Sequence, residues 1–550
     1  MDENNRQQKG DDPPNNVSAN RGKRGGDESI RETLPLLQPP SSDEAKAYYR
    51  GLPSMPRLVG RTSAGIVPCP PPLPQPLPNH FTSPTKLLGP VGRHCILECW
   101  ETTVREKILH ALGNLDWTTV DVVRIGYDNV PVLERPVVVW VGVANTAHQW
   151  NPTVCEALRG CRKVLDQAGL LDVECEIRVS EVRHLALPRP QLLDRPYKTI
   201  LYPISTNIGT SMCPAQVESH VGSLCIYISL AHDHNGTGPL WALTCRHVAL
   251  PKDVYPTDKT YKWTNTSQPA IKINSPASKD LQNECKTIKF RISVLKAQLN
   301  RRPEDKHFRN ILSMEEDLLS KLKPFEPAIC RLAGSVFAAP IIEQAEYWGE
   351  GREAPYLWSR DWCLVELDRQ RFPNNAADLT NRVYLMSEDG SDDDLNRRLN
   401  PNNKNRNKFK FPADGYMQLS GVIPMAEIRN PESLNVEGQE CFIVGKRGSA
   451  TKLTWGCPSE IMSTLRTVLD GEPAFETREW AIVSSLGSKT TAFSKGGDSG
   501  SLIFGIDGRL GGILTRGTRF GLDSDITYVT PMEVVLADIE QVLGLKVKVL

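Results

Sequence analysis

The feature that most constrains this chain is a serine closely flanked by glycines, in the stretch Gly496-Gly497-Asp498-Ser499-Gly500-Ser501 near the C-terminal end. An apolar strand candidate, 502–504, follows it directly. Glycines favour a tight turn here, because they adopt backbone angles that a side chain would forbid. Backbone amides that converge in such a turn, the serine's own among them, can stabilise the oxyanion formed when a serine oxygen attacks a carbonyl. The stretch alone is equally compatible with a plain hairpin turn, so its interpretation depends on residues elsewhere.

A histidine and an aspartate lie upstream in settings that suit the same chemistry. His247 closes an apolar strand candidate, 240–244, and begins a second apolar stretch. Asp361 precedes the apolar-rich run 362–367. An aspartate at the buried start of a strand can accept a hydrogen bond from an imidazole and fix its tautomer. A single histidine so placed is usually structural, so the interpretation depends on the combination of the three residues.

In this order the stretches resemble the trypsin/chymotrypsin family of serine proteases, especially its disulfide-poor, HtrA-like intracellular members. Trp241-Ala-Leu-Thr-Cys-Arg-His247-Val resembles the family's catalytic-histidine segment, and 360–368 resembles its aspartate strand. Residues 440–456 resemble the hairpin that opens the second barrel, and 510–517 and 526–530 resemble the strands beside the specificity pocket. The chain order histidine, aspartate, serine is that of trypsin and differs from that of subtilisins and α/β-hydrolases.

The resemblance covers roughly residues 200–545 and implies an all-β, trypsin-like double barrel. It implies that Ser499 is the nucleophile, that His247 is the general base and then the general acid, and that Asp361 orients His247. The amides of Gly497 and Ser499 would form the oxyanion hole. The resemblance therefore predicts a serine-type endopeptidase acting through an acyl-enzyme intermediate.

The same resemblance assigns residues to a substrate pocket. Phe493 occupies the position of the family's pocket floor, and Thr515, Arg516 and Gly517 should form a wall. An apolar floor without a carboxylate argues against cleavage after Lys or Arg. We expect small or apolar side chains in the pocket.

Two departures from the family pattern bear on compartment and activation. Secreted members have cysteines at the positions held here by Val248 and Lys495, and the loss of these disulfides fits a reducing compartment. No activation-type new N-terminus is evident, so Asp498 must find a partner other than a freed amino group.

The rest of the chain divides into segments of different character. Residues 1–90 contain 16 of the 42 prolines, which predicts a disordered, proline-rich tail. Residues 91–183 alternate helix and strand signals, including strand candidates at 118–126 and 136–143 and a helix that starts at Asn151-Pro152. We interpret this segment as a small α+β domain without a catalytic or metal signature.

Two insertions interrupt the protease-like pattern of 200–550. In 276–324 apolar residues recur at the alternating steps of 4 and 3 that are typical of coiled-coil packing, which predicts an antiparallel helical hairpin. The hairpin could contact a partner protein or shield the cleft, and a passive insertion is equally compatible with the pattern. Residues 387–411 are acidic, then asparagine-rich, then basic, which predicts a flexible surface loop or a linker between the barrels.

Charge and cysteine content exclude several classes of partner and compartment. Lys+Arg and Asp+Glu both number 65, so the net charge gives no reason to expect binding to nucleic acid or to a membrane. The longest apolar run, about 136–144, is shorter than the roughly 18 residues of a membrane helix, and the polar N-terminus lacks a signal-peptide core. The fourteen cysteines form no Cys-x-x-Cys pair. We expect reduced thiols in a cytoplasmic protein.

Three functions remain compatible with these patterns. The first is an intracellular serine endopeptidase that cleaves a peptide or protein and needs no cofactor or metal. The second is a catalytically silent pair of trypsin-like barrels used as a protein-interaction module, although a silent site would not need all three triad residues. The third is a non-peptide acyl hydrolase, which the strand pattern disfavours. His232 and His234 have a metal-compatible spacing but no third ligand nearby, and we interpret them as part of a polar loop.

Overall fold

A computed structural model of the chain describes residues 37–63, 85–144, 150–184, 207–233, 238–256, 259–263, 269–349, 354–372, 379–385, 392–400, 409–428, 430–434, 440–468, 474–484, 492–519 and 523–550. Residues Gln38–Leu550 form one unit. Strands dominate it, in two large sheets of 13 and 9 strands and two small sheets of two strands each. The protein is therefore mostly β, as the sequence predicts.

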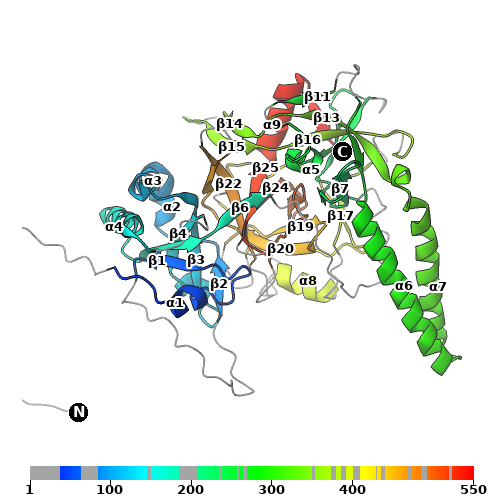
Figure 1. Cartoon of the computed structure of the whole chain (residues 1–550), viewed down its shortest axis with the longest axis horizontal. Coiled ribbons are helices and arrows are strands. Elements are labelled where there is room, and N and C mark those ends of the chain that lie inside the picture. The colour runs from blue at the N-terminus through cyan, green and yellow to red at the C-terminus, as the bar shows by residue number, and fades with distance from the viewer. Residues whose placement is uncertain are drawn as a thin grey trace, which may run out of the picture. The chain divides into compact units, whose positions relative to one another are not determined.

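The larger sheet joins segments from both halves of the chain (Figure 1). Its strands are β1 Leu58–Arg61, β2 Lys86–Gly89, β3 Trp117–Tyr127, β4 Val137–Val143, β5 Val173–Val179, β6 Glu181–His184, β19 Val444–Gly448, β20 Lys452–Pro458, β21 Ser463–Thr467, β22 Phe475–Val483, β23 Leu502–Gly505, β24 Leu510–Arg519 and β25 Ser524–Pro531. Six of them, in the order β22, β20, β19, β23, β24 and β25, pair antiparallel in a ring, because β25 pairs with β22 again. The C-terminal part thus contains a closed ring of strands.

The smaller sheet carries the segments around the predicted histidine and aspartate. Its strands are β7 Ser211–Pro214, β8 Gly222–Ser223, β9 Tyr227–Leu230, β10 Leu240–Thr244, β11 Tyr261–Lys262, β12 Lys272–Asn274, β13 Leu332–Ala339, β16 Cys363–Leu367 and β26 Val547–Val549. Its pairing runs from β26 to β8 without returning to the first strand in the described part of the chain. The two-stranded sheets are β14 Glu343–Tyr347 with β15 Tyr356–Arg360, and β17 Arg382–Tyr384 with β18 Tyr416–Gln418.

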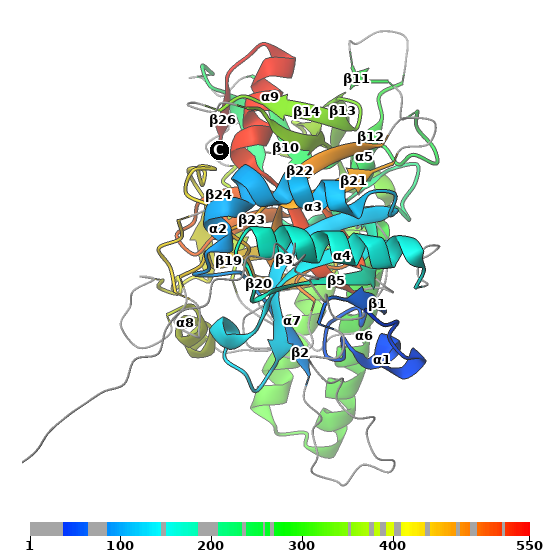
Figure 2. The same ribbon diagram turned by 90° about the vertical axis from the view of Figure 1, so that its left-hand side faces the viewer.

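Helices fill the connections between strands. They are α1 Ser42–Ala47, α2 Ile96–Cys99, α3 Arg105–Leu112, α4 Pro152–Gln167, α5 Arg246–Ala249, α6 Ser278–Arg301, α7 Lys306–Leu322, α8 Asp392–Leu399 and α9 Met532–Leu543. Figure 2 shows α3 and α4 side by side along the β3–β5 part of the sheet. Helix α4 begins where Asn151-Pro152 predicts, since the Asn151 side chain accepts a hydrogen bond from the Val154 amide (3.0 Å).

The helical hairpin predicted over 276–324 is present as α6 and α7, which run side by side (Figure 1). A small apolar cluster of Leu281, Cys285, Ile288, Leu318 and Leu322 holds the two helices together. Glu315, which interrupts the apolar stripe in the sequence, is fully buried and pairs with Arg291 of the other helix at 3.0 Å. The charge is therefore tolerated because it has a partner across the hairpin.

Part of the segment expected to be a disordered tail is folded. Residues 37–63 form α1 and β1, and β1 pairs with β5 at the edge of the larger sheet. Tyr49 is fully buried in a cluster with Trp140 and Tyr528. Aromatic residues just after the end of α1 thus bury enough surface to order this stretch despite its prolines. The remainder of 1–90 lies outside the described residues, apart from the segment that contains β2.

The α+β segment 91–183 and the loop 387–411 also differ in part from what the sequence predicts. Strand β3 of the predicted α+β segment pairs with β21, and β6 pairs with β24, so this segment shares a sheet with the C-terminal ring.

The predicted loop 387–411 contains α8, whose Leu395 and Leu399 are buried in the main core. Leucines four residues apart lie on one face of a helix, and this packing outweighs the polar composition. The rest of that loop is described only from residue 409.

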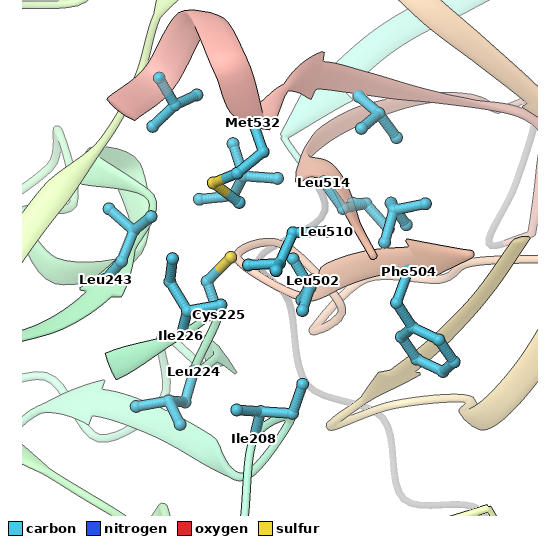
Figure 3. Packing of buried hydrophobic residues seen from close by; sticks show 14 of the residues in the cluster. Ile208, Leu224, Cys225, Ile226, Leu243, Leu502, Phe504, Leu510, Leu514 and Met532 are labelled. Carbon is cyan, nitrogen blue, oxygen red and sulfur yellow. The ribbon is translucent and has the colours of Figure 1, made fainter. Parts of the chain in front are cut away.

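The main core lies between the two large sheets. Figure 3 shows Cys225 and Leu243, next to or within the smaller sheet, with Leu502, Leu510 and Leu514 of the larger one. These side chains are 0–1 % exposed. Burial of such apolar surface stabilises the association of the two sheets by roughly 25 cal/mol per Å², and their contact is where the candidate site lies.

Candidate active site

The structure brings His247 and Asp361 together at neighbouring strand ends. Strands β10 and β16 are paired up to Thr244 opposite Cys363, and the two residues lie just beyond this pair. The Asp361 carboxylate is 2.6 Å from His247 Nδ1 and also accepts a hydrogen bond from the His247 amide at 3.1 Å. A carboxylate accepts hydrogen bonds, so the proton belongs on Nδ1 and Nε2 is the basic nitrogen.

His220, which the sequence analysis did not single out, contacts the same histidine. Its Nε2 lies 2.9 Å from the His247 carbonyl oxygen, which can only accept, so His220 donates. Burial lowers the pKa of His220, and the neighbouring His247 lowers it further. The residue therefore favours its neutral form while it holds the backbone of His247. No local pattern in the sequence marks this role.

The loop around Ser499 is a tight turn held by backbone contacts. Gly497 and Gly500 have φ angles of +105° and +86°, which glycine adopts without strain. The Gly500 amide donates to the Leu514 carbonyl at 2.8 Å, and Ser499 Oγ lies 3.2 Å from the Thr515 carbonyl. The serine is fully buried. The loop is thus fixed against the middle of β24.

Short contacts join the Ser499 loop to the His247 segment. The amide of Ser223 in β8 donates to the Ser499 carbonyl at 2.7 Å. A Cβ placed on the adjacent Gly222 would lie 2.4 Å from the Val248 side chain and 2.9 Å from the Ser499 carbonyl oxygen. The Val248 side chain, next to His247, and the Ser499 carbonyl therefore both lie against Gly222 of β8.

Asp498, beside the candidate nucleophile, has an internal cation as its partner. Lys446 Nζ lies 3.3 Å from the carboxylate, and both side chains are fully buried. The carboxylate also accepts hydrogen bonds from the amides of Ala450, Thr451 and Lys495 at 2.9–3.1 Å. Burial lowers the pKa of Lys446, and Asp498 opposes that shift. The ion pair ties the β19–β20 hairpin to the nucleophile loop.

Of the residues assigned to the pocket, Thr515, Arg516 and Gly517 lie in β24, whereas Phe493 lies in a bend before the Ser499 loop. Phe493 is 1 % exposed, and Thr515 is buried beside Ser499. The Arg516 guanidinium donates to Thr467 Oγ1 and Ser359 Oγ, both at 2.6 Å, so it is engaged within the fold. The backbone of Gly517 pairs with β25 on one edge and with β6 on the other.

A buried carboxylate lies close to this arrangement. Glu479 in β22 accepts hydrogen bonds from the Ser359 amide (3.2 Å) and from Thr530 Oγ1 (3.0 Å). Burial raises the pKa of Glu479 to about 7, while Arg516 acts in the opposite direction. This group changes its charge close to neutral pH.

One group of side chains has the spacing of metal ligands. Cys245, His247 and Asp361 offer ligand atoms that all lie within 4.8 Å of one another. Burial raises the pKa of the Cys245 thiol well above its usual value, and the thiol donates to the Leu514 carbonyl at 3.3 Å. A metal would need the thiolate and would displace the histidine–aspartate hydrogen bond. The contacts fit proton transfer better than metal binding.

A separate cavity of about 320 Å³ lies away from these residues. It is lined by Glu101, Arg105, Glu106, Ala354, Pro355, Tyr356, Leu357, Met425, Ile428, Met462, Thr464, Glu476 and Arg478. The lining contains carboxylates and guanidinium groups but none of the three triad candidates. In the described part of the chain, no helix is both long and apolar enough to cross a membrane.

The chain matches no protein-family model and no curated protein. Among solved structures it is similar to "A glutamic acid specific serine protease utilizes a novel histidine triad in substrate binding", with 11 % identity, coverage of 62 % of this chain and 100 % of that chain, and a TM-score of 0.27. A TM-score this low carries no argument about this chain.

Proposed function

We propose that the protein is a serine endopeptidase in which Ser499, His247 and Asp361 act as a catalytic triad. The single observation that carries the proposal is the contact of His247 Nδ1 with the buried Asp361 carboxylate (2.6 Å), next to Val248, which lies against the same glycine, Gly222, as the Ser499 carbonyl. This contact leaves Nε2 as the base. A serine on a glycine-held loop, within reach of such a base, would suit acyl transfer.

The proposed reaction follows from these positions. His247 Nε2 removes the proton from Ser499 Oγ as the oxygen attacks the peptide carbonyl, and then donates that proton to the leaving amine. The Asp361 carboxylate stabilises the imidazolium. We assign the amides of Gly497 and Ser499 to the oxyanion, where loss of one such donor typically costs about 3–4 kcal/mol in the transition state. Water then hydrolyses the acyl-enzyme with the same histidine as base.

We also propose that the two sheets are a diverged trypsin-like barrel pair. The closed ring that includes β23 and β24 carries the serine, and the sheet that includes β10 and β16 carries the histidine and aspartate. The triad candidates then come from both sides of the contact between the sheets. Each cysteine that the structure describes is a free thiol, which supports our proposal of a cytoplasmic location.

A fluorophosphonate probe tests the proposal directly, because it forms a covalent bond only with an activated serine. We expect the wild-type protein to be labelled, S499A to be unlabelled, and H247A to be labelled at a rate reduced by about 10³-fold or more. S501A is the matched control, since this neighbouring hydroxyl donates to the Asp498 carbonyl (2.6 Å) and has no part in the proposed reaction. Equal labelling of wild type and S499A would contradict the proposal and favour a catalytically silent interaction module.

A further inference from the structure

We propose that β6 occupies the position that the extended backbone of a substrate takes on β24, so that the chain covers its own substrate-binding edge. The inference rests on the proposed function, because it concerns access to Ser499. Strand β6 comprises Glu181–His184 and pairs antiparallel with the C-terminal half of β24 (Figure 1). The pairs are Arg516 with His184, Gly517 with Arg183, Thr518 with Val182 and Arg519 with Glu181.

The register places the end of β6 next to the nucleophile. Strand β25 pairs with one edge of β24 along its whole C-terminal half. The opposite edge pairs with β23 as far as Ile513 and with β6 from Arg516 onward. Leu514 and Thr515 lie between these pairings, and their carbonyls contact the Gly500 amide and Ser499 Oγ. A strand paired at the β6 position therefore ends opposite Arg516, one residue from Thr515, whose carbonyl contacts Ser499 Oγ.

The direction of β6 is that of a peptide approaching the serine with its C-terminal end. Because the pairing is antiparallel, the chain runs from Glu181, opposite Arg519, to His184, opposite Arg516. An extended peptide with the same direction would bring the carbonyl after its last paired residue to Thr515 and Ser499. Addition of a strand to a sheet edge binds through main-chain hydrogen bonds, so it accepts varied sequences.

The side chains of β6 give it only a partial anchor. Val182 is half-buried and packs against the cluster that contains Trp140 and Tyr528. Arg183 pairs with Glu181 of its own strand, and its side chain is 54 % exposed. Most of the specific contact is thus the backbone ladder with β24. A peptide could replace such an occupant. Its apparent association constant would be its intrinsic constant multiplied by the fraction of molecules in which β6 has left the edge.

Proline substitution tests this occupancy, because proline has no amide hydrogen. In an antiparallel ladder only alternate residues of a strand donate an amide hydrogen to a given neighbouring strand. Residues 182 and 183 are adjacent, so V182P/R183P removes a donor to β24 whichever of the two residues supplies it. We expect this variant to cleave fluorescent casein with kcat/KM raised about tenfold, mainly through a lower KM. Fluorophosphonate labelling should be unchanged, because the small probe does not need the edge of β24. V182A/R183A keeps both amides and loses only the partial anchor of the side chains, so kcat/KM should rise much less than in V182P/R183P.

A reversible crosslink tests the same occupancy without removing a backbone amide from the ladder. Val182 and Thr518 are opposed in the ladder, and opposed residues of antiparallel strands lie at a separation that suits a disulfide. Oxidised glutathione would accept the two electrons released when the thiols of V182C/T518C form the disulfide. We expect casein cleavage to fall about tenfold or more after oxidation and to recover with dithiothreitol, while probe labelling persists.

The outcomes separate this inference from the proposed function. Equal casein cleavage by the oxidised and reduced crosslink variant, with normal probe labelling, would overturn the occupancy of the edge and leave the protease proposal standing. The same holds if V182P/R183P is labelled normally and cleaves casein at the wild-type rate. Absence of labelling and cleavage in the wild type and in all variants would overturn the proposed function and the inference with it.

Discussion

Two fully buried ion pairs lie in different parts of the molecule and stabilise different features of it. Lys446 and Asp498 meet inside the C-terminal ring, beside the candidate nucleophile. Arg178 of β5 pairs with Asp121 of β3 at 3.1 Å, and the carboxylate of Asp525 in β25 lies 3.9 Å from the same guanidinium. Both sites take charges out of water, which costs several kcal/mol per ion unless each charge has partners.

The partners of the two sites differ in kind. Asp498 accepts hydrogen bonds mainly from backbone amides, so the pair fixes the path of the loops around Ser499. The second site is bonded mainly by side chains from distant parts of the chain, as Ser463 and Tyr528 donate to Asp121. Arg178 also lies over the Trp140 ring, 3.4 Å from its centre. We infer that the first pair shapes the active site and that the second joins segments of the sheet.

The largest effect should follow from D498A. The substitution leaves Lys446 buried without its counterion and three amides without their acceptor. We expect the free energy of unfolding to fall by about 3–5 kcal/mol and kcat/KM to fall by about 10²-fold or more as the oxyanion donors shift. Urea unfolding and casein cleavage measure the two effects.

The double variant K446M/D498A separates charge from geometry at the same site. Replacement of a whole buried pair by apolar groups is often nearly neutral for stability, so we expect much of the lost stability to return. Activity should stay low, because alanine has no acceptor for the amides and the thioether of methionine is only a weak one. Recovery of both stability and activity would contradict the assignment of Asp498 as a residue that positions the loop.

R178M should have the next largest effect, and on stability rather than on chemistry. Burial already raises the pKa of Asp121 and of Asp525, and Arg178 opposes both shifts. Without the arginine we expect a loss of about 3 kcal/mol at pH 7. A buried carboxyl with a raised pKa binds its proton more tightly in the folded state, so the loss should shrink as the pH falls toward 5.

Probe labelling is the control that distinguishes the two pairs. The fraction of R178M that remains folded should react with the fluorophosphonate at the wild-type rate, because no contact of Arg178 reaches the Ser499 loop in the described structure. A labelling rate that falls in folded R178M as far as it does in D498A would remove the distinction between the two pairs.

Glu479 predicts a pH dependence of stability on β22, the strand that joins the C-terminal ring to the rest of the larger sheet. This strand pairs with β21 on one side and closes the ring with β25 on the other. The pKa of Glu479 is raised from 4.5 to about 7. The folded protein therefore holds this proton more tightly than the unfolded chain does, and stability falls as pH rises through this window. We expect a loss of about 2–3 kcal/mol between pH 4.5 and 7, and a flatter urea-unfolding profile in E479Q. An identical slope in E479Q would contradict this origin.

Local sequence patterns predicted those parts of the structure that depend on neighbouring residues. The spacing of apolar residues predicted α6 and α7, and Asn151-Pro152 predicted the start of α4. The ends of apolar strands marked His247 and Asp361, which the structure places in contact. Each of these signals lies within one turn, one helix or one strand.

Contacts between distant segments could not be read in this way. The partner of Asp498 is Lys446, 52 positions earlier, in a hairpin with no charge pattern of its own. The pairing of β6 with β24 joins segments more than 300 residues apart, and β-strand patterns specify a face rather than a partner. His220 and the fold of residues 37–63 likewise depend on burial against distant elements. Long-range pairing is therefore what the structure adds.

The smallest predicted effect concerns the point where the N-terminal segment meets the second ion pair. The Ser54 amide donates to Asp525 at 2.7 Å, and the Ser54 hydroxyl also donates to that carboxylate. S54A keeps the amide contact and removes the hydroxyl, so we expect the free energy of unfolding to fall by about 1 kcal/mol. In R178M the Asp525 carboxyl is more often protonated and needs this donor less, so S54A should cost less in that background. Equal costs in the two backgrounds, measured by urea unfolding in a double-mutant cycle, would show that Ser54 and Arg178 act on Asp525 independently.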